Sequence, residues 1–252
     1  MVSLAFLRKE IQEMVKTPKL IIIASVFVFF AIIGPLTAKY MNELIAMFAS
    51  DIEISFPDPT YVQSWEQFYS NITSISMIVF LILMTGTVVA EKNKGSIYLM
   101  LTKNVTRTSF LVSKMIAGIL LFTTVFIMSV LISWYYTWML FDQVTYEGLA
   151  LSLLSIFMLG IFFTMVAVLL SVLLKSTTHA ALLAFAAYAI LNILTILSDI
   201  NPYNPAGATT LALNQLKGVD AIQPLLINVL ISLVITIILA IASIRIFNKQ
   251  EL

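Results

Sequence analysis

Hydrophobic residues in this chain are gathered into six long segments that contain no charged residue. The segments cover residues 20–38, 72–90, 115–140, 149–174, 180–197 and 225–244. A bilayer core about 30 Å thick requires about 20 consecutive apolar residues in an α-helix, and each segment meets or approaches that length. The pattern predicts an all-α integral membrane protein with six transmembrane helices, which form one domain over residues 1–252.

The residues before the first segment follow a different pattern, in which apolar and polar side chains occupy opposite faces of a helix over residues 3–17. The apolar face carries Leu4, Leu7, Ile11, Met14 and Val15, and the polar face carries Arg8, Lys9, Gln12, Glu13 and Lys16. An amphipathic helix of this kind lies in the headgroup layer, where its basic side chains are attracted to anionic lipid. We interpret it as an interfacial helix that anchors the chain at the membrane surface; binding of a partner protein is the alternative.

The connections between the segments differ in length. The connection after the first segment, residues 39–71, is long, and its Phe56-Pro57-Asp58-Pro59 stretch disfavours both helix and strand. The connections between the third and fifth segments are short, so these three helices are expected to be antiparallel neighbours. Residues 199–224 contain two Asn-Pro breakers before a short helical stretch near residues 211–216.

The composition agrees with a membrane protein. Of the 252 residues, 60% are hydrophobic and 11% are charged, and the mean hydropathy is +1.01, whereas soluble domains are about 45–50% apolar and about 25% charged. A chain this apolar requires lipid around it, and no nucleic-acid partner is expected. Because cysteine is absent, disulfides, thiolate metal sites and cysteine nucleophiles are excluded.

The distribution of basic residues predicts which side of the membrane each connection faces. Of the 14 Lys and Arg residues, four precede the first segment, five lie between residues 91 and 114, and three are Lys175, Arg245 and Lys249. Only Lys39 and Lys217 fall on the opposite side. Since basic residues are enriched on the cytoplasmic side, we expect a multi-pass protein of the cell membrane with both termini in the cytoplasm.

The connection between the second and third segments carries the most specific pattern. Gly95 can end one helix and the next residue can cap another. We expect this second helix to comprise Ser96, Ile97, Tyr98, Leu99, Met100, Leu101, Thr102 and Lys103. Bulky apolar side chains on a short cytoplasmic helix indicate docking of a protein partner; immersion of the loop in the headgroups is the alternative. Beyond this helix, Arg107 and Lys114 are placed to contact phosphates or helix carbonyls.

The same connection resembles the signature of ABC-2 type permeases, the membrane subunits of bacterial ATP-binding-cassette exporters. The matching positions are Glu91, Gly95, Ser96, Leu99, Leu101, Arg107 and Lys114. Ser96 stands where the family has Thr, and Asn104 stands where it has Pro. The resemblance extends over the amphipathic start, the six spans and the long outer loops, and the residues before the second span look like those of small permeases that work with antimicrobial or toxic peptides.

The resemblance implies a non-catalytic transport subunit. Residues 96–103 would be the coupling helix that docks a separate cytoplasmic ATPase, which binds ATP and Mg; this chain itself has no G-x-x-x-x-G-K-[ST] loop. Glu91 would stabilise the inner end of the second span and bond the first helix, with Gly95, Arg107 and Lys114 as supporting residues. The permease would pair with a second copy or a related subunit. Its cargo would be hydrophobic or amphipathic, with a peptide favoured over a drug or a lipid.

Other polar residues offer little catalytic chemistry. His179, the only histidine, lies in a turn without a matched nucleophile or further metal ligands, so no catalytic, cofactor or metal site is expected in this chain. Asn192 and Asn228 are the notable polar groups within the spans, where they either join helices by hydrogen bonds or contact the cargo. A membrane interaction, immunity or assembly protein without a transport cycle is the alternative function.

Overall fold

The computed structural model describes residues 4–48, 58–95, 97 and 106–250. Helices dominate these residues, and no strand occurs among them. Six helical stretches are long and apolar enough to cross a membrane: Pro18–Lys39, Tyr61–Asn93, Arg107–Phe141, Leu149–Leu173, Thr177–Leu194 and Ile222–Lys249. The predicted all-α membrane fold with six spanning helices is therefore confirmed.

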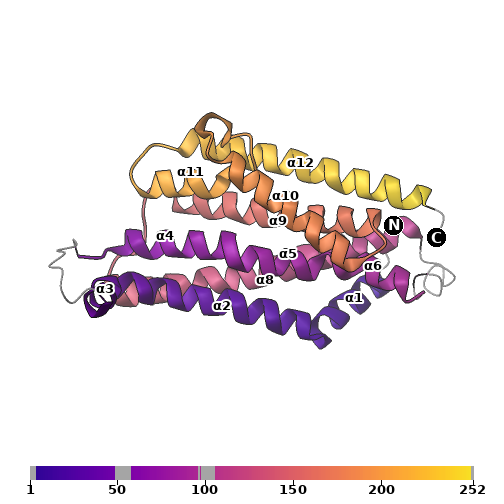
Figure 1. Cartoon of the computed structure of the whole chain (residues 1–252), viewed down its shortest axis with the longest axis horizontal. Helices are drawn as coiled ribbons and strands as arrows, with labels where there is room; N and C mark the ends of the chain where they lie inside the picture. The colour runs from indigo at the N-terminus through magenta and orange to yellow at the C-terminus, as the bar shows by residue number, and fades with distance from the viewer. Residues whose placement is uncertain (1–3, 49–57, 96, 98–105, 251–252) are drawn as a thin grey trace.

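Each of these stretches overlaps one predicted segment. Five are single helices: α2 (Pro18–Lys39), α8 (Arg107–Phe141), α9 (Leu149–Leu173), α10 (Thr177–Leu194) and α12 (Ile222–Lys249). The other elements outside the second span are α1 (Leu4–Lys16), α3 (Met41–Phe48), the 3₁₀ turn η2 (Ser198–Ile200) and α11 (Gly207–Leu216). Figure 1 shows an elongated bundle with both termini at one end, where α1 meets α2 at an angle, and with α3 and α11 at the opposite end.

The second span begins earlier than the sequence predicts. It consists of α4 (Tyr61–Asn71), the π-helical turn η1 (Ile72–Ser76), α5 (Met77–Met84) and α6 (Gly86–Asn93). Thr60 and Gln63 form a capping box at its start, in which the Thr60 backbone N–H donates to Gln63 Oε1 over 2.8 Å. The expectation of a loop over residues 39–71 is therefore wrong for residues 61–71, because this cap and the buried Trp65, Phe68 and Tyr69 favour helix there, and it is also wrong for α3.

The central helix of the bundle is α9, which contacts α5, α6, α8, α10, α11 and α12. Its Gly160 packs directly on the ring of Phe122 in α8, where an added Cβ would lie only 1.9 Å from Phe122 Cζ. Further aromatic rings surround Phe122: Phe27, Phe80, Phe126 and Phe157. Packing this close leaves little freedom between α8 and α9, so it also fixes the position of the charged residues at the start of α8.

Hydrogen bonds of side chains close the end of the bundle opposite the termini. Trp65 of α4 donates through Nε1 to the carbonyl oxygen of Val144 over 2.8 Å. The hydroxyls of Tyr69 and Tyr146 share a hydrogen bond of 2.6 Å. These bonds attach the 142–148 connection to α4, which also contacts α11. The two ends of the bundle therefore differ, since the charged residues described next gather at the end that holds the termini.

Candidate functional site

One buried lysine joins three helices at the end of the bundle that holds the termini. Lys114, near the start of α8, has a side chain that is 3% exposed. Its ammonium donates to Glu10 Oε2 of α1 over 2.9 Å and to Glu91 Oε1 of α6 over 2.8 Å. The side chains of Glu10 and Glu91 are 5% and 10% exposed. These charge-assisted bonds are shielded from water, so they hold α1, α6 and α8 in a defined relative position.

A second lysine extends this group into an ion-pair lattice, the name used below for Lys9, Glu10, Glu13, Glu91 and Lys114. The Lys9 ammonium lies 3.1 Å from Glu10, 2.6 Å from Glu13 and 3.6 Å from Glu91. Burial lowers the pKa of Lys9, but the hydrogen bond to Glu13 and the charges of Glu10 and Glu91 outweigh burial and raise it above its usual value. The hydrogen bond from Lys9 likewise lowers the pKa of Glu13.

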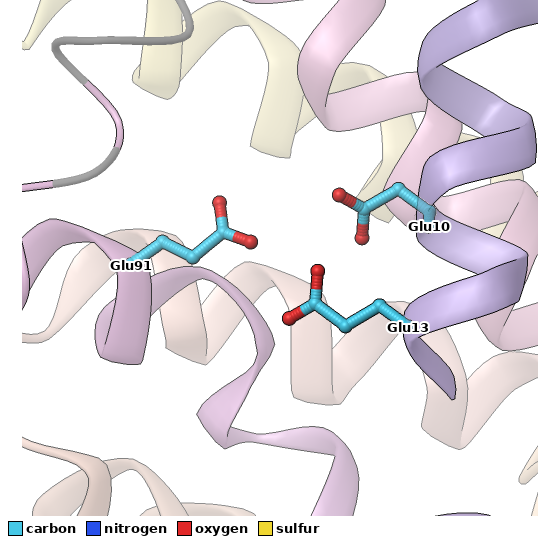
Figure 2. A group of neighbouring side chains, drawn as sticks. All are labelled: Glu10, Glu13 and Glu91. Atoms are coloured by element: carbon cyan, nitrogen blue, oxygen red, sulfur yellow. The ribbon is translucent and has the colours of Figure 1, made fainter. Parts of the chain in front are cut away.

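The carboxylates of the lattice point toward one another, as Figure 2 shows for Glu10 and Glu13 on α1 and Glu91 on α6. One oxygen from each of the three carboxylates lies within 4.8 Å of the other two, a spacing that the carboxylate ligands of a cation also show. The ammonium groups of Lys9 and Lys114 already lie among these oxygens, and a metal ion would have to displace them. The arrangement is therefore suited to holding helices together through paired charges.

The sequence pattern does not predict Glu10 as a member of this site. Glu10 lies about one helical turn after the buried Phe6 and one turn before the half-buried Met14, on the face of α1 that packs against the bundle. A single carboxylate on that stripe is the signal that could have revealed it. Ile11 and Val15 of the predicted apolar face are 37% and 58% exposed, so that face turns partly away from the protein, where lipid would lie.

The predicted coupling helix falls largely outside the described residues. This applies to Ser96, Tyr98, Leu99, Met100, Leu101, Thr102 and Lys103, whose helical structure stays a prediction. Gly95, just before them, has a φ of +68°, which glycine adopts without the strain that a side chain would cause. The chain therefore turns sharply at the end of α6, as the glycine in the motif suggests.

Ile97 is the one residue of the predicted coupling helix that the structure describes. Its side chain is 1% exposed and belongs to an apolar cluster that also contains Phe6 of α1, Phe110 of α8 and Phe247 of α12. The rings of Phe6 and Phe110 lie 5.4 Å apart between centroids, and those of Phe110 and Phe247 lie 5.6 Å apart. The chain after α6 is thereby packed against the helices at both ends of the sequence.

Hydrogen bonds also tie the end of α12 to the connection between the second and third spans. Arg107 donates through Nη1 to the carbonyl oxygens of Asn248 over 3.2 Å and Gln250 over 2.6 Å. Lys92 donates to Gln250 Oε1 over 2.6 Å and to a carbonyl oxygen at the end of α9 over 2.7 Å. Arg107 thus contacts backbone carbonyls, one of its two expected partners, whereas Lys114 contacts carboxylates, which the sequence did not suggest.

The two intramembrane asparagines are used differently. Asn228 is fully buried in α12, where its Oδ1 accepts from Ser155 over 2.9 Å and its Nδ2 donates to the carbonyl oxygens of Asn201 and Asn204 over 3.0 and 2.7 Å. These bonds occupy the side-chain amide and join α12, α9 and the chain before α11. Asn192 donates to the carbonyl oxygen of Tyr188 within its own helix over 2.9 Å. The geometry of Asn228 is that of a joint between helices.

A cavity of about 470 Å³ lies beside the ion-pair lattice, between α1, α2, α6 and α8. Its charged wall contains the lattice together with Lys19 and Lys94, and its apolar wall contains Ile23, Met84 and Leu121. The cavity is therefore amphipathic, and it lies at the same end of the bundle as both termini. The cavity is lined in part by α6 and α8, the helices that precede and follow the predicted coupling helix.

Comparison with known proteins gives two findings. The sequence profile described as "ABC-2 family transporter protein" matches residues 4–252. One curated relative, an uncharacterized transmembrane protein, YxlG, from Bacillus subtilis (strain 168), is 28% identical over 155 residues, which cover 60% of this chain and 60% of the relative. The aligned part therefore spans about 60% of the length of that relative.

Proposed function

The chain belongs to the ABC-2 family of transporter proteins, which makes it a membrane subunit of an ATP-binding-cassette transporter, and we propose that it is the permease of an exporter. In this proposal it has no catalytic, cofactor or metal site of its own. ATP and Mg are bound by a separate cytoplasmic ATPase, which docks on residues 96–103. The orientation with both termini in the cytoplasm is part of the proposal and is supported by the distribution of basic residues.

The observation that carries the proposal is the way the docking segment is joined to the bundle. Glu91 precedes the segment and is bonded through Lys114 to α8 and α1. Ile97 lies within the segment and is buried in an apolar cluster that includes residues of α1, α8 and α12, and Arg107 follows the segment and bonds to the end of α12. A push or pull on residues 96–103 would therefore reach α1, α6, α8 and α12 through contacts of the residues that flank or begin this segment.

A second permease copy and a hydrophobic or amphipathic cargo complete the proposal. α10 exposes large apolar side chains along its length, among them Leu182, Ile190 and Ile193, which suits packing against either lipid or a second subunit. The spans carry few charges, and the inner cavity combines apolar with charged walls, which suits an amphipathic cargo such as a peptide, with drugs and lipids as the other candidates. Export as the direction of transport rests on the family resemblance.

The test is co-purification of the tagged full chain from cells that express candidate ATPases, with a substitution in the docking segment. We expect the unmodified chain to carry a stoichiometric soluble subunit with a Walker A loop, and the Leu99→Asp, Leu101→Asp double variant to lose it. The matched control is Thr178→Asp with His179→Asp, which adds two carboxylates at exposed positions of α10. If the segment variant keeps both ATPase association and cargo efflux, the docking role is wrong and a non-transporting interaction protein is favoured.

A further inference from the structure

The wall of the cavity beside the ion-pair lattice carries a formal net charge of +1, because Lys19 and Lys94 join the two lysines and three carboxylates of the lattice on it. Lys19 is the second residue of α2, the first span, and Lys94 follows the last residue of α6. Neither forms an ion pair with any residue that the structure describes, whereas Lys9 and Lys114 are each paired with carboxylates. The Lys19 ammonium is half-buried and feels repulsion from Lys94 and Lys114 as well as attraction from carboxylates of the lattice. An additional anion near Lys19 and Lys94 would therefore be stabilised.

The position of Lys19 is well defined on the cavity wall. An added Cβ on Gly86 would lie 3.9 Å from Lys19 Nζ, so the ammonium rests against the first turn of α6. Lys94 lies at the other end of the same short helix. Both lysines are at the boundary between a spanning helix and the charged end of the bundle, which is the depth of lipid headgroups.

An apolar groove lies on the other side of the cavity wall. It runs between the first two helices and α8, and its lining residues are Ile11, Met14, Val15, Leu20, Ala117, Leu120, Leu121 and Thr124. Met14 and Leu121 line both the groove and the cavity, so their side chains separate the two. Methionine and leucine side chains can change rotamer, and Leu120 is exposed on the outer side of the groove. The charged cavity and the groove together have the chemistry of a headgroup site followed by the start of a chain site.

We infer that this cavity binds one acidic phospholipid, with its phosphate between Lys19 and Lys94 and one acyl chain in the groove past Met14 and Leu121. A soluble anion would leave the apolar groove unused, and a zwitterionic or neutral lipid would add no net negative charge beside the two lysines. The lipid would come from the leaflet that faces the termini, which is the leaflet rich in anionic lipid if the termini are cytoplasmic. The inference goes beyond the proposed transport function and depends only on this orientation.

The location gives the lipid a structural consequence. It would fill the space between α1 and α6 directly beside Glu13 and Glu91 of the lattice. Its negative charge would attract the lysines of the cavity, and its chain would pack on α1 and α8. The angle between α1 and the first span would therefore depend on the lipid composition of the membrane.

The experiment uses the full chain in nanodiscs of dioleoylphosphatidylcholine with an increasing fraction of dioleoylphosphatidylglycerol, and native mass spectrometry counts the lipids that the protein retains. We expect one retained phosphatidylglycerol in the unmodified chain. The Lys19→Gln, Lys94→Gln double variant should bind it about 30-fold more weakly, which corresponds to about 2 kcal/mol, or about 1 kcal/mol per lysine near an anionic lipid. Lys175→Gln with Lys249→Gln, two exposed lysines at the same end of the bundle, is the matched control and should retain the lipid.

Two further measurements make the inference independent of the double variant. A phosphatidylglycerol with a photoreactive acyl chain should crosslink to peptides that contain Met14 or Leu120 in the unmodified chain. Glycerol 3-phosphate, the headgroup without the chains, should not displace the lipid. Equal retention of phosphatidylcholine, displacement by glycerol 3-phosphate, or crosslinks confined to other helices would each overturn the inference. None of these outcomes involves the ATPase, so they are separate from a failure of the proposed transport function.

Discussion

Substitution of Lys114 by methionine tests whether the ion-pair lattice holds the helices together. Methionine has a similar length, so the change removes the charge with little loss of packing. Glu10 and Glu91, whose side chains are only 5% and 10% exposed, would lose their bonds of 2.9 and 2.8 Å. Removing one partner of a buried ion pair costs about 3–5 kcal/mol, because the remaining charge is left uncompensated.

The remaining lysine of the lattice reduces this cost. Lys9 still lies 3.1 Å from Glu10 and 3.6 Å from Glu91, but its side chain is 40% exposed, so water screens its charge. We therefore expect the lower end of the range, a loss of about 3 kcal/mol. At about 2–4 °C per kcal/mol for a chain of this size, the melting temperature should fall by about 6–12 °C.

The assay is thermal unfolding of the purified chain, followed by tryptophan fluorescence in one detergent. The control is Lys175→Met, which removes an exposed lysine at the same end of the bundle and should change stability by less than about 0.5 kcal/mol. Equal melting temperatures for the Lys114 and Lys175 variants would refute the reasoning. A triple variant, Glu10→Gln, Glu91→Gln and Lys114→Met, has no uncompensated charge among these positions, so most of the lost stability should return.

Three other changes test the packing and electrostatics away from Lys114. Gly160→Ala would place a Cβ against the ring of Phe122, 1.9 Å from its Cζ, and should lower the free energy of unfolding by about 1–3 kcal/mol. A second substitution in the same chain, Phe122→Leu, should recover part of this loss. An unchanged melting temperature for Gly160→Ala would contradict the close packing of these two residues. Asn228→Leu removes the hydrogen-bond partner of two carbonyls and one hydroxyl and should lower the free energy of unfolding by about 1–3 kcal/mol. If Asn228 only joins helices, efflux assays on the folded fraction of this variant should show unchanged cargo selectivity. Because the bond from Lys9 lowers the pKa of Glu13 from its usual 4.5 in the folded protein, this i,i+4 pair within α1 stabilises the helix above that value and is lost as the pH falls through the lowered pKa. Hydrogen exchange of the α1 amides should accelerate on this acidification, and Glu13→Gln should remove the pH dependence.

The six spans could be predicted from the sequence because each one is a run of apolar residues as long as the bilayer is thick. The ends of the helices could not be placed in the same way, since they depend on caps instead of hydropathy. α8 begins at Arg107, where the Thr106 side chain accepts from the Ser109 backbone N–H over 3.2 Å, whereas the apolar run begins at residue 115. The same applies to α4, whose capping box at Thr60 and Gln63 is visible in the sequence but lies outside the apolar run.

The ion-pair lattice could not be predicted from the sequence for a related reason. A search for uncharged segments places Lys114 just outside the third span, and it gives no partner for the charge. The two carboxylates that neutralise Lys114 lie 104 and 23 residues away in sequence, and a single sequence does not specify contacts at such separations. Glu91 belongs to the motif that the chain shares with its family, whereas Glu10 belongs to no motif and stands out only as a polar residue on the buried stripe of α1.

Buried paired charges in an apolar membrane domain call for a reason other than stability. Apolar side chains of similar volume would hold α1, α6 and α8 together at least as well. They would not fix how far one helix has slid along another, whereas the short bond from Lys114 to Glu10 breaks if α1 shifts along α8 by one turn, about 5.4 Å. Glu91 lies only a few residues before Ile97 on the same stretch of chain, so the lattice sets the register between α1 and the start of the docking segment. If that register transmits the motion of the ATPase, the triple variant should fold and still bind the ATPase, yet transport less cargo per ATP hydrolysed. Unchanged coupling in that variant would reduce the lattice to a structural joint.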